Sequence, residues 1–81
     1  MSIEKGSIVR AMAGRDKENF FVVLEVDSKY ALIADGKRRK VEHPKKKKLI
    51  HLAPTKTVIE GSFETNPQIK RILNQFIKNG G

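Results

Sequence analysis

Residues 20–26 read FFVVLEV, the most apolar stretch of this 81-residue chain, and they decide the expected fold. Aromatic and β-branched side chains favour strands, and a strand places alternate residues, here Phe20, Val22, Leu24 and Val26, on one face. A strand this apolar is prone to aggregate if its edges stay open. We therefore expect residues 20–26 to form the central strand of a small sheet.

The sequence before this strand predicts a second strand and a loop. Residues 7–12 alternate polar and apolar side chains and are followed by Ala13-Gly14. The next residues, 15–19, are all polar and cannot bury themselves, so we expect a loop. The N-terminal part of the chain is thus predicted to be a strand-loop-strand unit.

The sequence after the central strand predicts an antiparallel meander. Residues 27–29 make a tight connection to a strand over residues 30–34. Asp35-Gly36 then indicates a two-residue hairpin, because its turn type needs positive φ. Residues 37–42 are expected to be the fourth strand, in which only Val41 is strongly apolar.

A fifth strand is expected near residue 50. Pro44 cannot donate a hydrogen bond to a ladder, so the fourth strand ends before it and residues 45–48 are predicted to form a loop. Residues 49–52, LIHL, offer a short closing strand. Five short strands in about fifty residues suggest a small barrel, which would leave no open edge.

The C-terminal segment has a helical period. Asn66 is the expected N-cap, Pro67 the first helical residue and Gly80 the stop signal. A helix this short is marginal alone, so its apolar face is expected to dock on the barrel, with a protein partner as the alternative. Five apolar side chains share that face: Ile69, Ile72, Leu73, Phe76 and Ile77.

These elements predict a single domain of the mainly β class. The barrel is expected over residues 1–54, a connector over residues 55–65, and the amphipathic helix, packed on the barrel, over residues 66–79. A chain of 81 residues has room for one small core.

The composition excludes several classes of protein. Cysteine is absent, which excludes disulfides, thiolate metal sites and cysteine catalysis. The N-terminus lacks an apolar signal core, and no stretch approaches the roughly 20 apolar residues that span a bilayer. We expect a cytoplasmic monomer without membrane contact.

The charge distribution indicates a polyanionic partner. Eight of the 17 Lys and Arg residues lie within residues 37–48, KRRKVEHPKKKK, with one acid, Glu42, in a chain of net charge +8. Concentrated positive charge repels itself, and a phosphate backbone can neutralise it. A surface that merely aids solubility is the alternative, although such surfaces usually interleave both signs. This basic run therefore predicts binding to nucleic acid, with DNA and RNA both possible.

Part of the chain resembles a known family. Residues 5–10, KGSIVR, with residues 14–17, GRDK, and the strand at 20–26 look like a KOW motif, the strand-loop-strand element of ribosomal proteins and transcription elongation factors. One departure is Glu18, which stands where the KOW pattern usually has a glycine and so removes a residue suited to positive φ.

The resemblance continues beyond this motif. Residues 30–40 and 49–54 are similar to the KOW-bearing large-subunit ribosomal proteins of archaea and eukaryotes, the L-fourteen-e type, and to short bacterial KOW-domain RNA-binding proteins. The likeness covers roughly residues 5–54. It implies a five-stranded SH3-like barrel that binds RNA or the ribosome and has no catalytic activity.

The expected RNA contacts are the cations of the basic run and of the first loop. A ladder would hold the cations of residues 37–40 at fixed spacing along phosphates, while those of residues 45–48 would act as mobile point charges. The full set is Arg10, Arg15, Lys17, Lys37, Arg38, Arg39, Lys40, Lys45, Lys46, Lys47, Lys48 and His51.

Other chemistries have little support in the sequence. His43 and His51, without cysteine or a carboxylate cluster, do not indicate a metal site. No nucleophile stands beside a candidate base, so neither catalysis nor a cofactor is expected. We expect a non-catalytic module that docks on structured RNA, with ribosomal RNA as the first candidate. The alternative is a protein-interaction adaptor of the translation or transcription machinery that uses the helix face.

Overall fold

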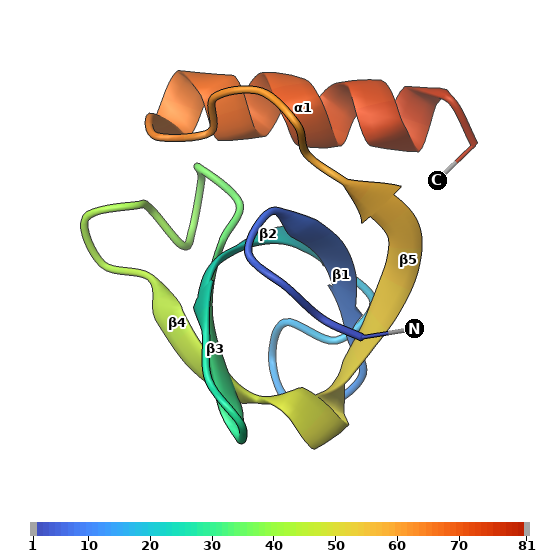
Figure 1. The fold of residues 1–81 in the computed structure, drawn as a ribbon. Coiled ribbons are helices and arrows are strands. Elements are labelled where there is room, and N and C mark those ends of the chain that lie inside the picture. Colours follow the sequence, from blue (N-terminus) through green and yellow to red (C-terminus); the bar gives the residue numbers. More distant parts are fainter. Residues whose placement is uncertain (1, 81) are drawn as a thin grey trace.

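A computed structural model describes residues 2–80 and shows a mainly β fold with one C-terminal helix (Figure 1). Five antiparallel strands form one sheet with the order β4-β3-β2-β1-β5. The elements in chain order are β1 (Ser7–Ala11), β2 (Phe20–Val26), β3 (Tyr30–Ala34), β4 (Lys45–Lys48), the 3₁₀ turn η1 (Leu49–His51), β5 (Leu52–Val58) and α1 (Asn66–Lys78).

The sheet is strongly curved. In Figure 1 its strands surround a common interior, and α1 crosses one end of it. The two outer strands are β4 and β5, and among residues 2–80 no ladder pairs them with each other. The sheet is therefore curved but open along these two strands.

The prediction that residues 20–26 form the central strand is confirmed. β2 pairs with β1 on one side and with β3 on the other. Both of its faces are buried: Phe21 and Val23 belong to the core inside the curved sheet, whereas Val22 belongs to the core under α1. Burial on both faces explains why this stretch is almost continuously apolar.

A bulge in β2 changes the environment of its last residue. The register with β3 shifts between Val23 and Glu25, and such a shift moves the following side chain to the other face. Phe20 and Leu24 pack under α1, while Val26 packs on the interior core. The expectation that these three side chains share a face is therefore wrong for Val26.

The predicted position of the fourth strand is also wrong. Residues 37–42 lie in the loop between β3 and β4, and β4 is formed by Lys45–Lys48, which were expected to form a loop. The Asp35 side chain accepts hydrogen bonds from two backbone N–H groups just after it, which closes a turn in place of a strand. Pairing with β3 resumes only at Lys45, opposite Ile33.

The closing strand is displaced in the same direction. Leu49–His51 forms η1, and β5 runs from Leu52 to Val58, into the segment expected to be a connector. Pro54 lies inside β5, opposite Val9 of β1. A proline is tolerated there because β5 is an outer strand.

The apolar face of α1 packs on the sheet. Ile69 and Leu73 are 0% and 5% exposed and share a core with Ile8 and Val22. At the C-terminal end of the helix the face is open, because Ile77 is 54% exposed. In the described part of the chain, no helix combines the length and the apolar character needed to cross a bilayer.

The N-cap of α1 is Thr65, so the prediction of Asn66 is wrong. The Thr65 hydroxyl accepts from the backbone N–H of Gln68, and the Gln68 side chain accepts from the backbone N–H of Thr65. This capping box leaves the Asn66 side chain free for another contact. At the other end, Gly80 has a φ of 96° directly after the C-cap, Asn79.

Candidate nucleic-acid interface

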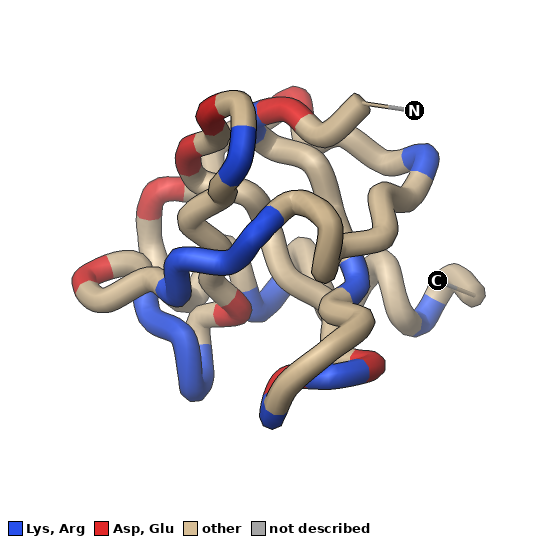
Figure 2. The backbone as a smooth tube through the Cα atoms, turned by 90° about the horizontal axis from the view of Figure 1, so that it is seen from below, with Lys and Arg blue, Asp and Glu red and all other residues tan. Residues whose placement is uncertain are grey.

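Three segments carry most of the cations expected to bind nucleic acid: the β1–β2 loop (residues 12–19), the β3–β4 loop (residues 35–44) and β4. Together they hold ten of the 17 Lys and Arg residues and four of the nine acids, so the excess positive charge is concentrated in them. In Figure 2, in which Lys and Arg are blue, the longest blue stretches lie on the left of the view, and shorter ones are scattered elsewhere.

The β3–β4 loop is shaped by Asp35. Its Oδ1 accepts hydrogen bonds from the backbone N–H groups of Lys37 and Arg39, both at 2.9 Å, and its own N–H donates to the Arg39 carbonyl at 2.9 Å. Gly36 follows with a φ of 79°. The compact turn leaves Lys37 and Arg38 exposed to solvent.

The other end of this loop is tied to α1 by Asn66. Its Oδ1 accepts from the backbone N–H of Val41 at 2.8 Å, and its Nδ2 donates to the Glu42 carboxylate at 2.9 Å. The helix also lies against the start of the loop, because a Cβ atom on Gly36 would sit 2.6 Å from the Asn66 carbonyl oxygen. The loop is thus held on the helix at two points.

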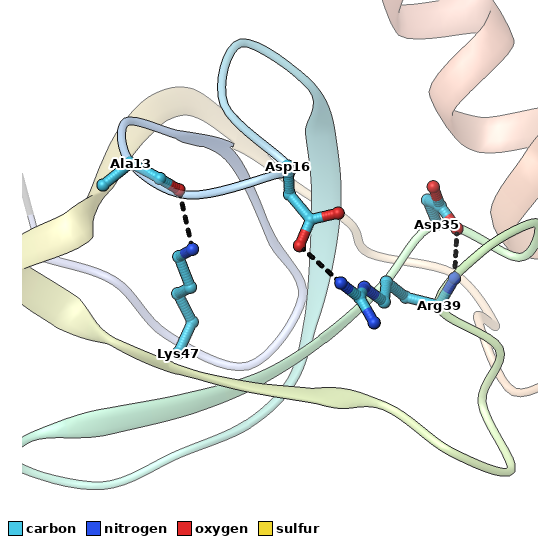
Figure 3. A network of polar contacts seen from close by, with 5 residues as sticks. All are labelled: Ala13, Asp16, Asp35, Arg39 and Lys47. Atoms are coloured by element: carbon cyan, nitrogen blue, oxygen red, sulfur yellow. Dashed lines mark hydrogen bonds and ion pairs between the residues drawn. The ribbon is translucent and has the colours of Figure 1, made fainter.

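An ion pair joins the β3–β4 loop to the β1–β2 loop. The Arg39 guanidinium donates to Asp16 Oδ2 at 2.9 Å (Figure 3). The Asp16 side chain is 3% exposed and the Arg39 side chain 30%. Arg39 Nε is buried without a hydrogen-bond partner among the described atoms. Arg39, predicted to contact phosphate, is therefore used to connect two loops.

A second link joins β4 to the same loop. Lys47 Nζ donates to the carbonyl oxygen of Ala13 at 2.7 Å (Figure 3). The contact fills the space beside Gly14, where an added Cβ atom would lie 2.9 Å from that nitrogen. Lys47, like Arg39, has a structural contact and is only partly accessible.

The lysines of β4 alternate between two environments. Lys45 and Lys47 are half-buried, and Lys46 and Lys48 are exposed. Lys46 Nζ lies 4.6 Å from the centre of the Tyr30 ring, within the range of a cation–π contact. Only two of the four lysines thus extend from the strand into solvent.

The β1–β2 loop contributes two exposed cations, Arg15 and Lys17. Arg10, on β1, forms an ion pair with Glu18, with 3.5 Å between a guanidinium nitrogen and a carboxylate oxygen. Glu18 has a φ of 74°, the one positive φ outside glycine in residues 2–80. An ordinary side chain thus occupies a conformation that favours glycine.

His51, which was expected to contact RNA, is less accessible than the exposed cations. It is half-buried in η1, and its backbone carbonyl accepts from the Met12 N–H at 2.8 Å. Within the described residues, no group of three or more His, Cys, Asp or Glu side chains could hold a metal ion.

The structure brings most of the predicted site residues together but divides them by role. Two of them, Arg39 and Lys47, connect segments, and Lys45 is half-buried. We call the exposed members the basic surface; it consists of Arg15, Lys17, Lys37, Arg38, Lys40, Lys46 and Lys48.

Of the residues that organise this surface, sequence reasoning named Asp35 as part of a turn and Asn66 as a helix cap, and it did not find their contacts or that of Asp16. Asp35 carries a local signal, since an Asp followed by glycine often accepts hydrogen bonds from the next backbone N–H groups. Asp16 and Asn66 carry no local signal for their contacts. The partner of Asp16 lies 23 residues away along the chain, and the two partners of Asn66 lie 24 and 25 residues away.

Two acids have pKa values below their usual range. The amide of Asn66, and then the backbone N–H of Glu42 itself, lower the pKa of the Glu42 carboxyl. Backbone hydrogen bonds from Lys29 and Tyr30, at 2.8 and 2.7 Å, lower the pKa of Asp27. The lowered pKa favours the ionised form of Glu42 beside the basic surface, and Asn66 holds its carboxylate at the start of α1.

A scan against models of protein families and a search of curated proteins found no match to this sequence.

Proposed function

We propose that this protein is a non-catalytic RNA-binding module of the KOW type that docks on structured RNA. Ribosomal RNA is the first candidate. The observation that carries the proposal is the basic surface: seven exposed cations on three segments that are fastened to one another. On this view the curved five-stranded sheet is an SH3-like barrel left open between β4 and β5.

The electrostatics of the three segments favour a polyanion. Their four acids are already engaged: Asp16 with Arg39, Glu18 with Arg10, Asp35 with backbone N–H groups, and Glu42 with Asn66. The exposed cations therefore have few neighbouring acids left to neutralise them. A phosphate backbone supplies that charge and releases counterions on binding.

The rigidity of the frame supports recognition of structured nucleic acid. Because Arg39, Lys47 and Asn66 hold the loops, the backbone segments that carry the cations are in position before any ligand arrives. Exposed aromatic rings suited to stacking on many bases are scarce: Phe21 is buried, and the Tyr30 ring is covered by Lys46. Contacts with the backbone of folded RNA fit this surface better than base reading along a single strand.

The KOW resemblance gains support from the conformation of Glu18. The family pattern usually has a glycine at this position, and Glu18 has the positive φ that a glycine would adopt freely. A positive φ at this position is what the family's glycine would provide, and this agreement supports the proposal although the residue differs.

The proposal is tested by binding to fragments of ribosomal RNA at several salt concentrations. If four to six cations contact phosphates, log K against log salt should have a slope of about −3 to −5. The double variant Arg38→Ala with Lys40→Ala should weaken binding and make the slope shallower by about 1.5.

The matched control removes the same charge from elsewhere. Lys5 and Lys56 are exposed and lie outside the three segments. The double variant Lys5→Ala with Lys56→Ala should therefore bind nearly as well as the unmodified protein. Equal losses in both double variants, or an affinity that does not change with added potassium chloride, would refute the proposal and favour a protein-interaction adaptor.

A further inference from the structure

A cleft lies between the β3–β4 loop and α1. Its volume is about 340 Å³, within the range of about 300 to 1,000 Å³ typical of sites for small ligands. Lys37 and Arg38 line it from the loop, and Lys70 and Asn74 line it from the helix. Two of these residues, Lys70 and Asn74, belong to none of the segments that form the basic surface.

The two walls of the cleft are held in place. Asn66 ties residues 41 and 42 of the loop to the start of α1. Gly36 packs so closely on the helix that an added Cβ atom would lie 2.9 Å from Lys70 Cγ. The cleft is therefore formed before a ligand binds, which reduces the entropic cost of binding.

The charge of the cleft matches a phosphate group. Lys37, Arg38 and Lys70 provide three cations. The single acid of the lining is Asp35, whose Oδ1 already accepts two backbone hydrogen bonds. An arginine and two lysines around one opening can bind phosphate oxygens with forked and single contacts.

The remaining lining matches a nucleobase. Phe20, Leu73 and Ile77 form an apolar side, and Ile77 is 54% exposed, so a flat ligand can cover it. The Phe20 ring is kept in place by Phe76, at a centroid distance of 5.2 Å. Polar edges of a base could be met by the carboxamide of Asn74.

We infer that this cleft binds one unpaired nucleotide, such as a bulged residue, of the RNA whose backbone contacts the basic surface. The inference rests on the proposed function and adds a subsite to it. Lys37 and Arg38 belong both to the basic surface and to the cleft, so an RNA docked on that surface passes the opening. Proteins read unpaired bases of folded RNA in this way, by holding them outside the stack.

The test uses two RNA hairpins that differ only by one bulged nucleotide in the stem. The unmodified protein should bind the bulged hairpin about tenfold more tightly than the paired one. In the variants Asn74→Ala and Ile77→Ala, whose side chains are exposed, the ratio of the two affinities should fall toward one. Thermal unfolding of each variant checks that the fold is retained.

The control is Gln75→Ala, which removes a carboxamide from the neighbouring exposed position outside the cleft. It should keep the preference for the bulge. Equal binding of both hairpins by the unmodified protein would overturn the inference while leaving the proposed function intact. If the unmodified protein bound neither hairpin at low salt, both the inference and the proposed function would be overturned. Saturation of the cleft by a free nucleoside monophosphate at micromolar concentration, without a preference for the bulge, would assign it to free nucleotides and would also overturn the inference.

Discussion

The Arg39 guanidinium donates to Asp16 Oδ2 at 2.9 Å and so joins two loops whose residues are 23 positions apart in the sequence. Asp16 is almost fully buried, with 3% of its side chain exposed. A buried carboxylate is costly unless it is paired, so Arg39 provides the partner that Asp16 needs in this loop. One member of the basic run therefore has a structural role.

Replacing Arg39 with alanine should destabilise the protein by about 2 kcal/mol, because Asp16 would stay buried without its partner. Urea unfolding measures the change. A double-mutant cycle with Asp16→Ala should give a coupling free energy of about 1 to 3 kcal/mol.

The pair Arg10–Glu18 is the matched control for this cycle. Its atoms are 3.5 Å apart, and the side chains are 41% and 59% exposed. Its coupling should be at most about 0.5 kcal/mol, since solvent screens exposed pairs. Additive effects of Arg39→Ala and Asp16→Ala would show that their contact does not stabilise the fold.

Gly36→Ala should destabilise the protein by about 2 to 4 kcal/mol and weaken RNA binding. The new Cβ would lie 2.6 Å from the Asn66 carbonyl oxygen, in a residue with a φ of 79°. The loop would have to move off the helix and take its cations with it. Gly61→Ala is the control, because no atom beyond its chain neighbours lies within 4 Å of its added Cβ; a similar loss there would contradict the explanation.

Glu18→Gly should stabilise the protein by about 0.5 to 1 kcal/mol. The gain comes from relief of the positive φ of 74°, and the greater freedom of glycine in the unfolded chain offsets part of it. Thermal unfolding provides the measurement. Lys17→Gly, one residue earlier in the same loop, lacks a positive φ to relieve and should lower stability instead.

Asn66→Ala should raise the pKa of Glu42 toward its usual value, because the amide that makes the largest contribution to lowering it is gone. Since the pKa of Glu42 is lowered in the folded protein, its contribution to stability is present above the usual glutamate pKa. That contribution is lost as the pH falls through the lowered value. A carbon-13 NMR titration of the Glu42 carboxyl in both proteins follows the shift directly.

An unchanged titration of Glu42 in Asn66→Ala would mean that the amide does not act on this carboxyl. Gln68→Ala is a suitable comparison, since Gln68 caps the same helix without contacting Glu42. It should reduce helix stability and leave the Glu42 titration as it is.

Much of the fold follows from local patterns in the sequence. β2 was predictable because burial on both faces requires a continuous apolar stretch, and α1 because Ile69 and Leu73 recur at helical spacing. The turn after β3 was indicated by Asp35 and Gly36, whose hydrogen bonds and positive φ are local properties. The concentration of charge was equally plain from residue order alone.

The placement of that charge was decided by tertiary structure. Residues 37–40 and 45–48 are both cationic runs, and no local pattern tells which one pairs with β3. Asp35 closes the first into a turn, and Pro44 then precedes the strand formed by the second.

The sequence by itself determined a small β-rich domain with an amphipathic C-terminal helix and a strongly basic segment. Only the folded chain decided which cations are free, because Arg39 and Lys47 meet partners far away in the sequence, Asp16 and Ala13. Local patterns report hydrophobic periodicity and turn chemistry. Contacts between residues 23 to 34 positions apart depend on how the strands bring their loops together. No local sequence pattern indicates such contacts.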